Sequence, residues 1–338
     1  MKQAEILELA THGTYQGEPV KGKIEETHIS WVLLSRRHAF KIKKPIKLSF
    51  LDFSNLALRQ QFCKRELQLN SRFSDIYLKV VPISKKENQW LVDSDEGTVV
   101  DYAVLMKRMD TSKRMDKYLH NNNVDEGRIQ LLAKKVAQFH QEADVIDTPF
   151  GMSEARNTFN DIAFSKKYIT THLGLSFGAL IDDSIQWSNK KLAVYESRMQ
   201  QRIVKGFKRD VHGDLHTGNV FLYRHPVIFD CIEFGDSYRQ IDVLYEIAFL
   251  CMDLESHGKK RLADAFLKAY TKLLPCIEND DDRAIFNYFK CLRANVRAKV
   301  HAVAAQQADE PTSRKLNLAK TRKYLNLMRK YIDQVPAD

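Results

Sequence analysis

Residues 210–236 read DVHGDLHTGNVFLYRHPVIFDCIEFGD, a stretch in which acidic, amide and imidazole side chains surround two short apolar runs. The runs NVFLY and VIFD are predicted to form two strands around a turn at residues 224–226. Asp, Asn and Gly are also ordinary turn residues, so their presence alone indicates only a change of chain direction. Their spacing says more, because Asp214 and Asn219 are five residues apart and Asp230 follows the second strand.

This spacing favours phosphoryl transfer. That reaction needs a carboxylate near the acceptor hydroxyl and oxygen ligands that hold Mg²⁺ against the phosphates. Asp214, Asn219 and Asp230 supply these groups. The order Asp, four residues, Asn, hairpin, Asp resembles the catalytic loop and metal-binding Asp of the protein-kinase-like fold. The form HGDLHTGN is most similar to the motif HGDxHxxN of the aminoglycoside phosphotransferase and choline kinase family, and the sequence that follows resembles an uncharacterised bacterial group within it.

The resemblance covers residues 25 to about 304 and implies a role for each matching residue. Asp214 would be the catalytic base, Asn219 a Mg²⁺ ligand, Asp230 the main Mg²⁺ ligand, and His212 a brace for the loop. His216 would either face the substrate or support the loop. Two more acids lie downstream: Glu233 is an additional ligand or an acid in a turn, with the turn favoured, and Asp242 is expected to cap or brace a helix.

A kinase-like chain also needs an upstream lysine on a strand and a glutamate on the next helix, which together hold the α and β phosphates. HAFK stands where such kinases have VAIK, so Lys41 is the predicted phosphate ligand, with Lys43 as the alternative and Glu66 as the partner. Other residues would bind the nucleotide. Adenine is expected near Ala39, Met106 and Met109, and the phosphates near Thr27, His28 and Ser30.

Hydrophobic periodicity predicts an α+β fold with two lobes. Strands are expected at 29–33, 39–41, 76–83 and 98–109, with a polar connection over 84–97, and a helix over 54–73 begins behind Ser54 as its cap. The pattern is helical after residue 110, and His140 in the helix over 127–144 is a packing residue. The prediction is a small lobe over 1–110, with an antiparallel sheet and one helix, and a larger, mainly helical lobe over 111–338 with a helical insertion at about 151–205.

Composition agrees with a folded enzyme. The chain has 338 residues, 44% of them hydrophobic, and five scattered cysteines that suggest neither disulfides nor a zinc site. We find no apolar run near the roughly 20 residues of a membrane span, and the N-terminus lacks the pattern of a secretion signal, so a cytoplasmic protein is expected. The formal net charge of +10 favours anionic partners.

The predicted function is therefore an ATP- and Mg²⁺-dependent phosphotransferase that acts on a hydroxyl of a small molecule. A neutral or anionic acceptor is favoured over a polycationic one, although ENDDD at 278–282 is a local acidic run. The first alternative is a catalytically silent nucleotide-binding module, because EETHISW and the sequence after Asp230 lack the usual glycines. The second is nucleic-acid or membrane-surface binding by the basic segment 313–331. Leu318, Leu325 and Ile332 share one helical face there, which favours a packed final helix. Nucleic acid is therefore an unlikely partner. The sequence leaves the oligomeric state open.

Overall fold

The computed structural model describes residues 1–48, 50–120 and 124–334, which fold as two compact units. Unit 1 comprises residues 1–117, 219–223 and 227–239, and unit 2 comprises residues 118–218, 224–226 and 240–338. The parts of the hairpin segment that carry Asn219 and Asp230 therefore belong to unit 1, although residues 224–226 between them and the chain on both sides belong to unit 2.

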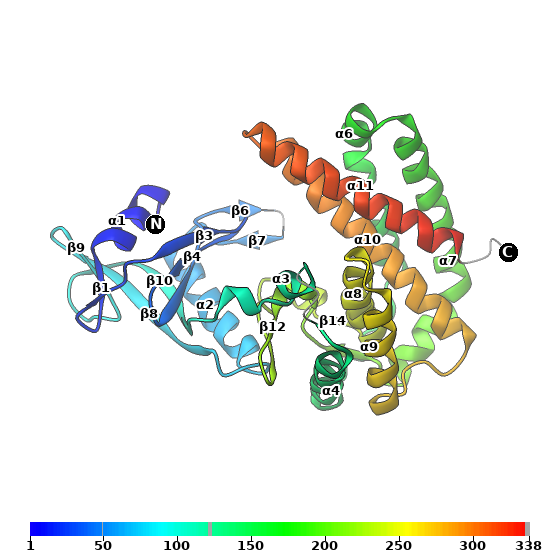
Figure 1. Cartoon of the computed structure of the whole chain (residues 1–338), viewed down its shortest axis with the longest axis horizontal. Coiled ribbons are helices and arrows are strands. Elements are labelled where there is room, and N and C mark those ends of the chain that lie inside the picture. Colours follow the sequence, from blue (N-terminus) through cyan, green and yellow to red (C-terminus); the bar gives the residue numbers. More distant parts are fainter. Residues whose placement is uncertain (49, 121–123, 335–338) are drawn as a thin grey trace. The chain divides into compact units, whose positions relative to one another are not determined.

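Unit 1 is built on an eight-stranded sheet with the order β2-β1-β9-β8-β10-β5-β4-β3 (Figure 1). Neighbouring strands run antiparallel, except that β1 runs parallel to β9. The predicted antiparallel sheet is thus confirmed in its main part. The strands are β1 (Gly13–Tyr15), β2 (Glu18–Pro19), β3 (Lys23–Glu26), β4 (Ser30–Leu34), β5 (His38–Lys43), β8 (Tyr77–Lys86), β9 (Gln89–Val92) and β10 (Thr98–Lys107).

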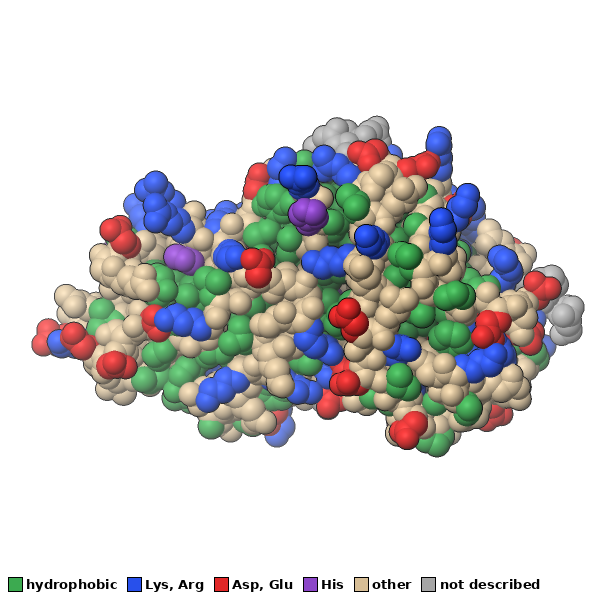
Figure 2. Space-filling view, turned by 90° about the horizontal axis from the view of Figure 1, so that it is seen from below, with side chains coloured by type: hydrophobic (Ala, Val, Ile, Leu, Met, Phe, Trp, Pro, Cys, Tyr) green, Lys and Arg blue, Asp and Glu red, His purple; other side chains and the backbone are tan. Residues whose placement is uncertain are grey.

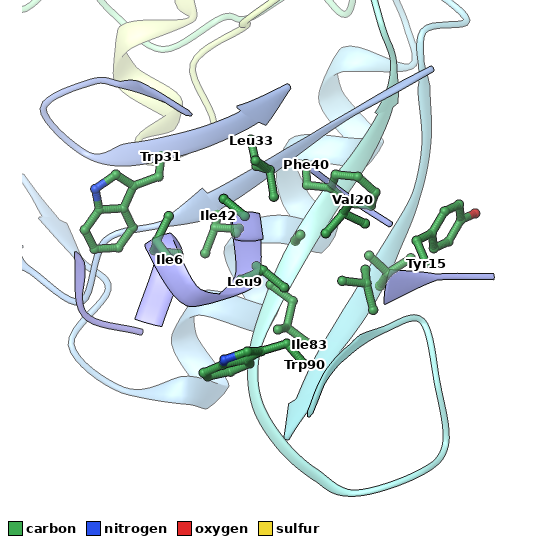
Figure 3. Close-up of a cluster of buried hydrophobic side chains, with 14 of the residues drawn as sticks. Ile6, Leu9, Tyr15, Val20, Trp31, Leu33, Phe40, Ile42, Ile83 and Trp90 are labelled. Atoms are coloured by element: carbon green, nitrogen blue, oxygen red, sulfur yellow. The ribbon is translucent and has the colours of Figure 1, made fainter. Parts of the chain in front are cut away.

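The two faces of this sheet carry different side chains because side chains alternate along a strand. In β5, Phe40 and Ile42 point to a core that also contains Ile6 and Leu9 of α1 (Gln3–His12), as Figure 3 shows. Ala39 packs in a second cluster on the opposite face with Cys63 of α2 (Leu56–Asn70). Lys41 and Lys43 alternate with Phe40 and Ile42 and so share the α2 face.

Three details of unit 1 differ from the sequence predictions. Unit 1 has a second helix, α1, which buries Ile6, Leu9 and Ala10. The connection over 84–97 is not only polar, because it contains β9. The cap of α2 is Asn55 rather than Ser54: Oδ1 of Asn55 accepts a hydrogen bond from the backbone N–H of Leu58 at 2.9 Å. An amide oxygen at this position satisfies a helix N–H that would otherwise lack a partner.

Two further small pairs of strands and three short helical elements lie wholly or partly in unit 1. The pairs are β6 (Lys47–Leu48) with β7 (Leu51–Asp52), and β12 (Val220–Leu222) with β13 (Pro226–Ile228). The hairpin predicted around residues 224–226 is thus present. The helical elements are the 3₁₀ turns at Thr111–Lys113 and Asp236–Tyr238 and helix α3 (Met115–His120).

Unit 2 is mainly helical, as predicted for the chain after residue 110. A strand pair, β11 (Lys208–Asp210) with β14 (Gln240–Asp242), joins its helices, and a 3₁₀ turn spans Thr217–Asn219. The helix α8 is buried on almost every side because its sequence is apolar nearly throughout. The helices are α4 (Glu126–Glu142), α5 (Met152–Asn160), α6 (Ala163–Leu173), α7 (Leu175–Val204), α8 (Val243–Ser256), α9 (Lys260–Leu273), α10 (Asp280–Gln307) and α11 (Pro311–Asp333).

The basic segment 313–331 forms most of α11, which packs along α10 (Figure 1). Leu325, Met328 and Tyr331 are buried, so the favoured interpretation of this segment as a packed helix agrees with the structure. On the face shown in Figure 2, Lys and Arg side chains are spread between Asp and Glu side chains. No helix in the described part of the chain is long and apolar enough to cross a membrane. No disulfide joins the five cysteines, all of which are buried.

Candidate functional site

A cluster of charged side chains in unit 1, which we call the lysine cluster, contains Lys41, Lys43, Glu66, Asp230 and Glu233. One carboxylate bridges both lysines: Oε1 of Glu66 lies 2.7 Å from Nζ of Lys41, and Oε2 lies 2.8 Å from Nζ of Lys43. The structure therefore brings together the predicted pair Lys41 and Glu66, and it also places the alternative lysine on the same glutamate.

The other two carboxylates distinguish the lysines. Asp230 Oδ1 lies 2.5 Å from Nζ of Lys41, and 42% of the Asp230 side chain is exposed. Glu233 is paired with Lys43, and neither side chain is exposed by more than 3%. Lys41 thus belongs to a pair that solvent can reach, whereas Lys43 belongs to a sealed one. Glu233 is the buried counterion of Lys43 and not a turn acid, because a buried ammonium group needs a compensating charge.

All charges in the lysine cluster depend on one another. Burial alone would lower the pKa of Lys41, but the carboxylates of Asp230 and Glu66 outweigh it and hold that pKa well above its usual value. Burial likewise opposes the charge of Glu66, yet the two lysines lower its pKa to about 2. Lys41 and Glu66 are therefore ionised at neutral pH, and Lys41 offers a permanent cation beside the exposed carboxylate of Asp230.

The backbone around Asp230 is held by residues that the sequence did not indicate. Asp230 has a φ of +66°, a left-handed conformation that is unusual for a residue other than glycine. Its N–H donates to the Tyr77 hydroxyl at 2.9 Å, and the N–H of Cys231 donates to Oδ1 of Asn70 at 2.8 Å. Such external bonds hold a conformation that the chain would otherwise avoid.

Asn219 and Asp230 lie on the two arms of the β12–β13 hairpin. The backbone carbonyl of Asn219 accepts a hydrogen bond from the N–H of Phe229, the residue before Asp230, at 3.1 Å. A carboxylate and an amide oxygen are hard ligands of the kind that Mg²⁺ prefers, so this pair of residues fits that ion chemically. The described residues contain no group of three or more His, Cys, Asp and Glu side chains arranged to hold a metal.

The residues predicted to bind adenine lie together on the α2 face of the sheet. Ala39 and Met106 are buried, and Met109 packs against them, as do the partly buried side chains of Val227 and Phe229 from the hairpin. Of the predicted phosphate donors, Thr27 and His28 lie in the turn between β3 and β4, whereas Ser30 is the first residue of β4. Thr27 Oγ1 accepts the N–H of Ser30 at 2.9 Å. Thr27 and His28 are exposed, whereas Ser30 is fully buried.

Unit 2 contains the second cluster, the HGD loop, which we define as residues 212–217. Two acids seven residues apart on α8 hold its ends. Glu246 accepts the backbone N–H groups of His212 and Gly213, both at 3.1 Å. Asp253 Oδ2 accepts the N–H of Thr217 at 3.0 Å and its hydroxyl at 2.5 Å. Neither acid was predicted, although acids within the otherwise apolar stretch VLYEIAFLCMDL are a signal that a motif search overlooks.

The central residue of the HGD loop is Asp214, whose backbone N–H donates to Nδ1 of His212 at 3.2 Å. Its Oδ2 lies 3.4 Å from Nε2 of His216, whose Nδ1 accepts the N–H of Gly218 at 3.0 Å. Burial would raise the pKa of Asp214, but the charge and hydrogen bond of His216 outweigh it and lower that pKa to about 2. Asp214 is therefore a carboxylate throughout the physiological pH range.

A guanidinium group closes the loop from α10. Arg293 Nη2 donates to the carbonyl of Gly213 at 3.2 Å, and the Arg293 guanidinium lies over the Tyr245 ring at 3.8 Å from its centroid. Gly213 has a φ of +85°, so a side chain there would strain the turn. Burial raises the pKa of Glu246 to about 7, and the charge of Arg293 limits that rise.

Asp242 and His140 have the structural roles that the sequence predicted for them. Asp242 caps α8 by accepting the N–H of Leu244 at 2.7 Å, and it also pairs with Arg202 at 2.7 Å. His140 is buried with Nδ1 at 2.7 Å from the Tyr270 hydroxyl, and burial lowers its pKa to about 3. Neither residue needs a part in catalysis to explain its position.

Comparisons with known proteins identify the family of this chain. Residues 55–284 match the model of the phosphotransferase enzyme family. Uncharacterised proteins of Mycobacterium tuberculosis and Mycobacterium bovis are 30% identical over 311 residues, and this match covers 87% of the chain but only 58% of those relatives. The chain thus spans little more than half the length of the curated relatives it matches.

Solved structures show the same fold at low identity. A choline kinase from Cryptosporidium parvum has a TM-score of 0.57 at 12% identity, covering 98% of this chain and 97% of that one. A putative aminoglycoside phosphotransferase from Ralstonia eutropha has a TM-score of 0.55 at 10% identity, with 99% of each chain covered. A GDP complex of an aminoglycoside 2′-phosphotransferase has a TM-score of 0.54 at 13% identity, with 93% of this chain and 91% of that one covered. The fold is therefore that of the kinase-like phosphotransferases.

Proposed function

Because the chain belongs to the phosphotransferase enzyme family, we propose that it transfers the γ-phosphoryl group of ATP to a hydroxyl of a small molecule, with Mg²⁺ as the required metal. The observation that supports this most is the HGD loop. It holds the ionised Asp214 in a fixed position through Glu246, Asp253 and Arg293. A loop with so many buried anchors is suited to orient a reacting hydroxyl.

Unit 1 would bind the nucleotide. Lys41 would neutralise phosphate charge with Glu66 as its support, while Ala39, Met106 and Met109 would contact adenine and Thr27 and His28 the phosphates. Asn219 and Asp230 would hold Mg²⁺, which neutralises charge on the phosphate oxygens when it is bound. Lys43 has a structural role in this proposal, because it is sealed away with Glu233.

Unit 2 would bind the acceptor through Asp214. The acceptor oxygen forms a bond to the γ-phosphorus while the bond from that phosphorus to the β-γ bridging oxygen of ATP breaks, and the hydroxyl proton passes to Asp214. A carboxylate with a pKa of about 2 is a weak base. We therefore infer that Asp214 mainly orients the hydroxyl and takes the proton late, which suits the loose transition state of phosphoryl transfer.

The alternative is a catalytically silent nucleotide-binding module. It is suggested by the absence of the usual glycines in EETHISW and after Asp230. The ionised Asp214, which buried anchors hold within the HGD loop, favours the enzyme over the silent module.

Incubation with γ-labelled ATP, Mg²⁺ and a fractionated small-molecule cell extract tests the proposal. We would compare the natural chain with Asp214→Asn and with Asp95→Asn, whose target is an exposed acid of unit 1 outside the site. The natural chain and Asp95→Asn should label a small molecule, and Asp214→Asn should lose about 10²- to 10⁴-fold in rate, the range for a proton-transfer group, with unchanged ATP binding. ATP binding without labelled product in any fraction would identify a silent module.

A further inference from the structure

We propose that the acceptor carries an anionic group in addition to its reactive hydroxyl, and that Arg297 of α10 and Lys323 of α11 bind this group beside the HGD loop. The inference rests on the proposed function and names the class of its second substrate: a phosphorylated or carboxylated hydroxyl compound. All of the residues that carry it belong to unit 2.

The two basic side chains gather around one aromatic ring. The guanidinium carbon of Arg297 lies 5.5 Å from the centroid of Tyr324, and Nζ of Lys323 lies 5.2 Å from it. The ring of His301 stacks on Tyr324 with 5.7 Å between centroids. Cations lie favourably over an aromatic face, so Tyr324 fixes both charges in place.

The same tyrosine connects these charges to the catalytic loop. Its hydroxyl donates to Oδ1 of Asp253 at 3.3 Å, and Oδ2 of Asp253 holds Thr217, three residues after Asp214. Arg297 is close enough to Asp214 for its charge to help lower the pKa of that carboxyl, behind the larger effect of His216. An anion on Arg297 would therefore be bound by the same unit as Asp214 and near it.

Arg297 has hydrogen-bonding capacity to offer. Its Nε is buried and has no hydrogen-bond partner among the described residues, whereas Arg293, one turn earlier on α10, donates to the carbonyl of Gly213. A buried donor on a charged group is costly when it stays unsatisfied. A carboxylate or phosphate oxygen would satisfy it with a charge-assisted bond once the Arg297 side chain turns to expose Nε.

The local charge balance also favours an anion. Asp253 already accepts hydrogen bonds from Thr217, Tyr324 and Ser256. Burial lowers the pKa of Lys323, and the neighbouring positive charges of Arg297 and Lys320 lower it further, with Asp253 opposing them. Burial and the same basic neighbours lower the pKa of His301 to about 4. Three basic side chains, Arg297, Lys320 and Lys323, thus lie near one another. Asp253 and Asp214 offset part of the Arg297 charge, and the basic side chains disfavour a polycationic acceptor.

The test separates the small-molecule extract into anionic, neutral and cationic pools by ion exchange before labelling with γ-labelled ATP and Mg²⁺. We expect the labelled product to come from the anionic pool. A product from the neutral or cationic pool alone would overturn the inference and leave the proposed phosphotransfer intact. If no pool is labelled although ATP binds, the proposed function fails and the inference falls with it.

Variants then locate the anion site. Arg297→Gln and Lys323→Gln should each raise KM for the purified acceptor by about tenfold or more, with kcat and KM for ATP nearly unchanged. Arg329→Gln, an exposed basic residue elsewhere on α11, is the matched control and should behave like the natural chain. Thermal unfolding identifies any variant that fails to fold. If Arg297→Gln does not fold, Lys323→Gln still tests the site. An unchanged KM for the acceptor in a folded variant contradicts the assigned site.

Discussion

Replacement of Lys43 by methionine should lower the free energy of unfolding of unit 1. The affinity of the folded protein for ATP should stay nearly unchanged. The Lys43 side chain is wholly buried, and its loss leaves Glu233 and one oxygen of Glu66 without a cation. Breaking a buried ion pair from one side costs about 3–5 kcal/mol, because the remaining charge stays unpaired. A typical domain is stable by only about 5–15 kcal/mol, so this loss is large.

A second variant separates pairing from packing. Lys43→Met combined with Glu233→Gln removes both charges, so the double variant should be more stable than Lys43→Met alone, by about 1–3 kcal/mol. By contrast, Lys41→Met should weaken the binding of ATP strongly and destabilise the fold less, because 10% of the Lys41 side chain remains exposed. Lys43→Met leaves Lys41 with both of its carboxylates.

The measurement must report on unit 1 alone, since a two-unit protein need not unfold in one step. Two of the three tryptophans, Trp31 and Trp90, belong to unit 1, and Trp187 belongs to unit 2. Urea unfolding followed by fluorescence in a Trp187→Phe background therefore gives the free energy of unfolding of unit 1. Titration calorimetry in dilute buffer gives ATP affinity. The reasoning fails if Lys43→Met is as stable as the background, or loses as much ATP affinity as Lys41→Met.

Three further outcomes are expected. Thr217→Val removes one of the two hydrogen bonds that Thr217 donates to the buried Asp253, so it should cost about 1.5–3 kcal/mol in urea unfolding and reduce turnover; an unchanged midpoint would contradict the anchoring of the HGD loop. Burial opposes the charge of Asp282, but Arg198 and Arg202 outweigh it and lower the Asp282 pKa to about 2, so this carboxyl stabilises the fold above its ordinary pKa near 4 and ceases to do so as the pH falls toward 2. Asp282→Asn should therefore lower Tm at pH 7 and converge with the natural chain near pH 2. Asp230→Asn should lose little stability, since asparagine tolerates a left-handed φ and Glu66 still pairs with the Lys41 ammonium group, but should lose at least about 100-fold in Mg²⁺-dependent turnover.

The parts of the fold that the sequence predicts are those with strong local periodicity. Alternation over 29–41 and the helical repeat over 54–73 each bury one face, and both elements are present. α1 and β9 were overlooked because they are short: β9 buries only Trp90 and Val92, too few positions for a clear period.

The sequence indicates those residues of the candidate site that form a motif along the chain. It does not indicate residues that come together only in the folded protein. A period of two places Lys41 and Lys43 on the same strand face, so spacing alone cannot decide between them. Their counterions differ and so support the proposal of Lys41, but the pair of Lys43 with Glu233 spans 190 residues of chain. Glu246 and Asp253 escaped notice for the same reason, since only the folded chain shows that α8 faces the HGD loop.

Unit 1 consists of separate chain segments, and this affects how it folds during translation. Its first 117 residues emerge early, yet Asp230, Glu233 and the hairpin side chains of its second hydrophobic cluster are made about 120 residues later. At roughly 5–20 residues per second, the nascent sheet waits some 6–24 s with the ammonium group of Lys43 lacking one of its two carboxylates. Slowing translation between codons 118 and 218 should therefore lengthen the exposure of this unit to chaperones and proteases, and a fragment ending at residue 117 should be an avid chaperone client.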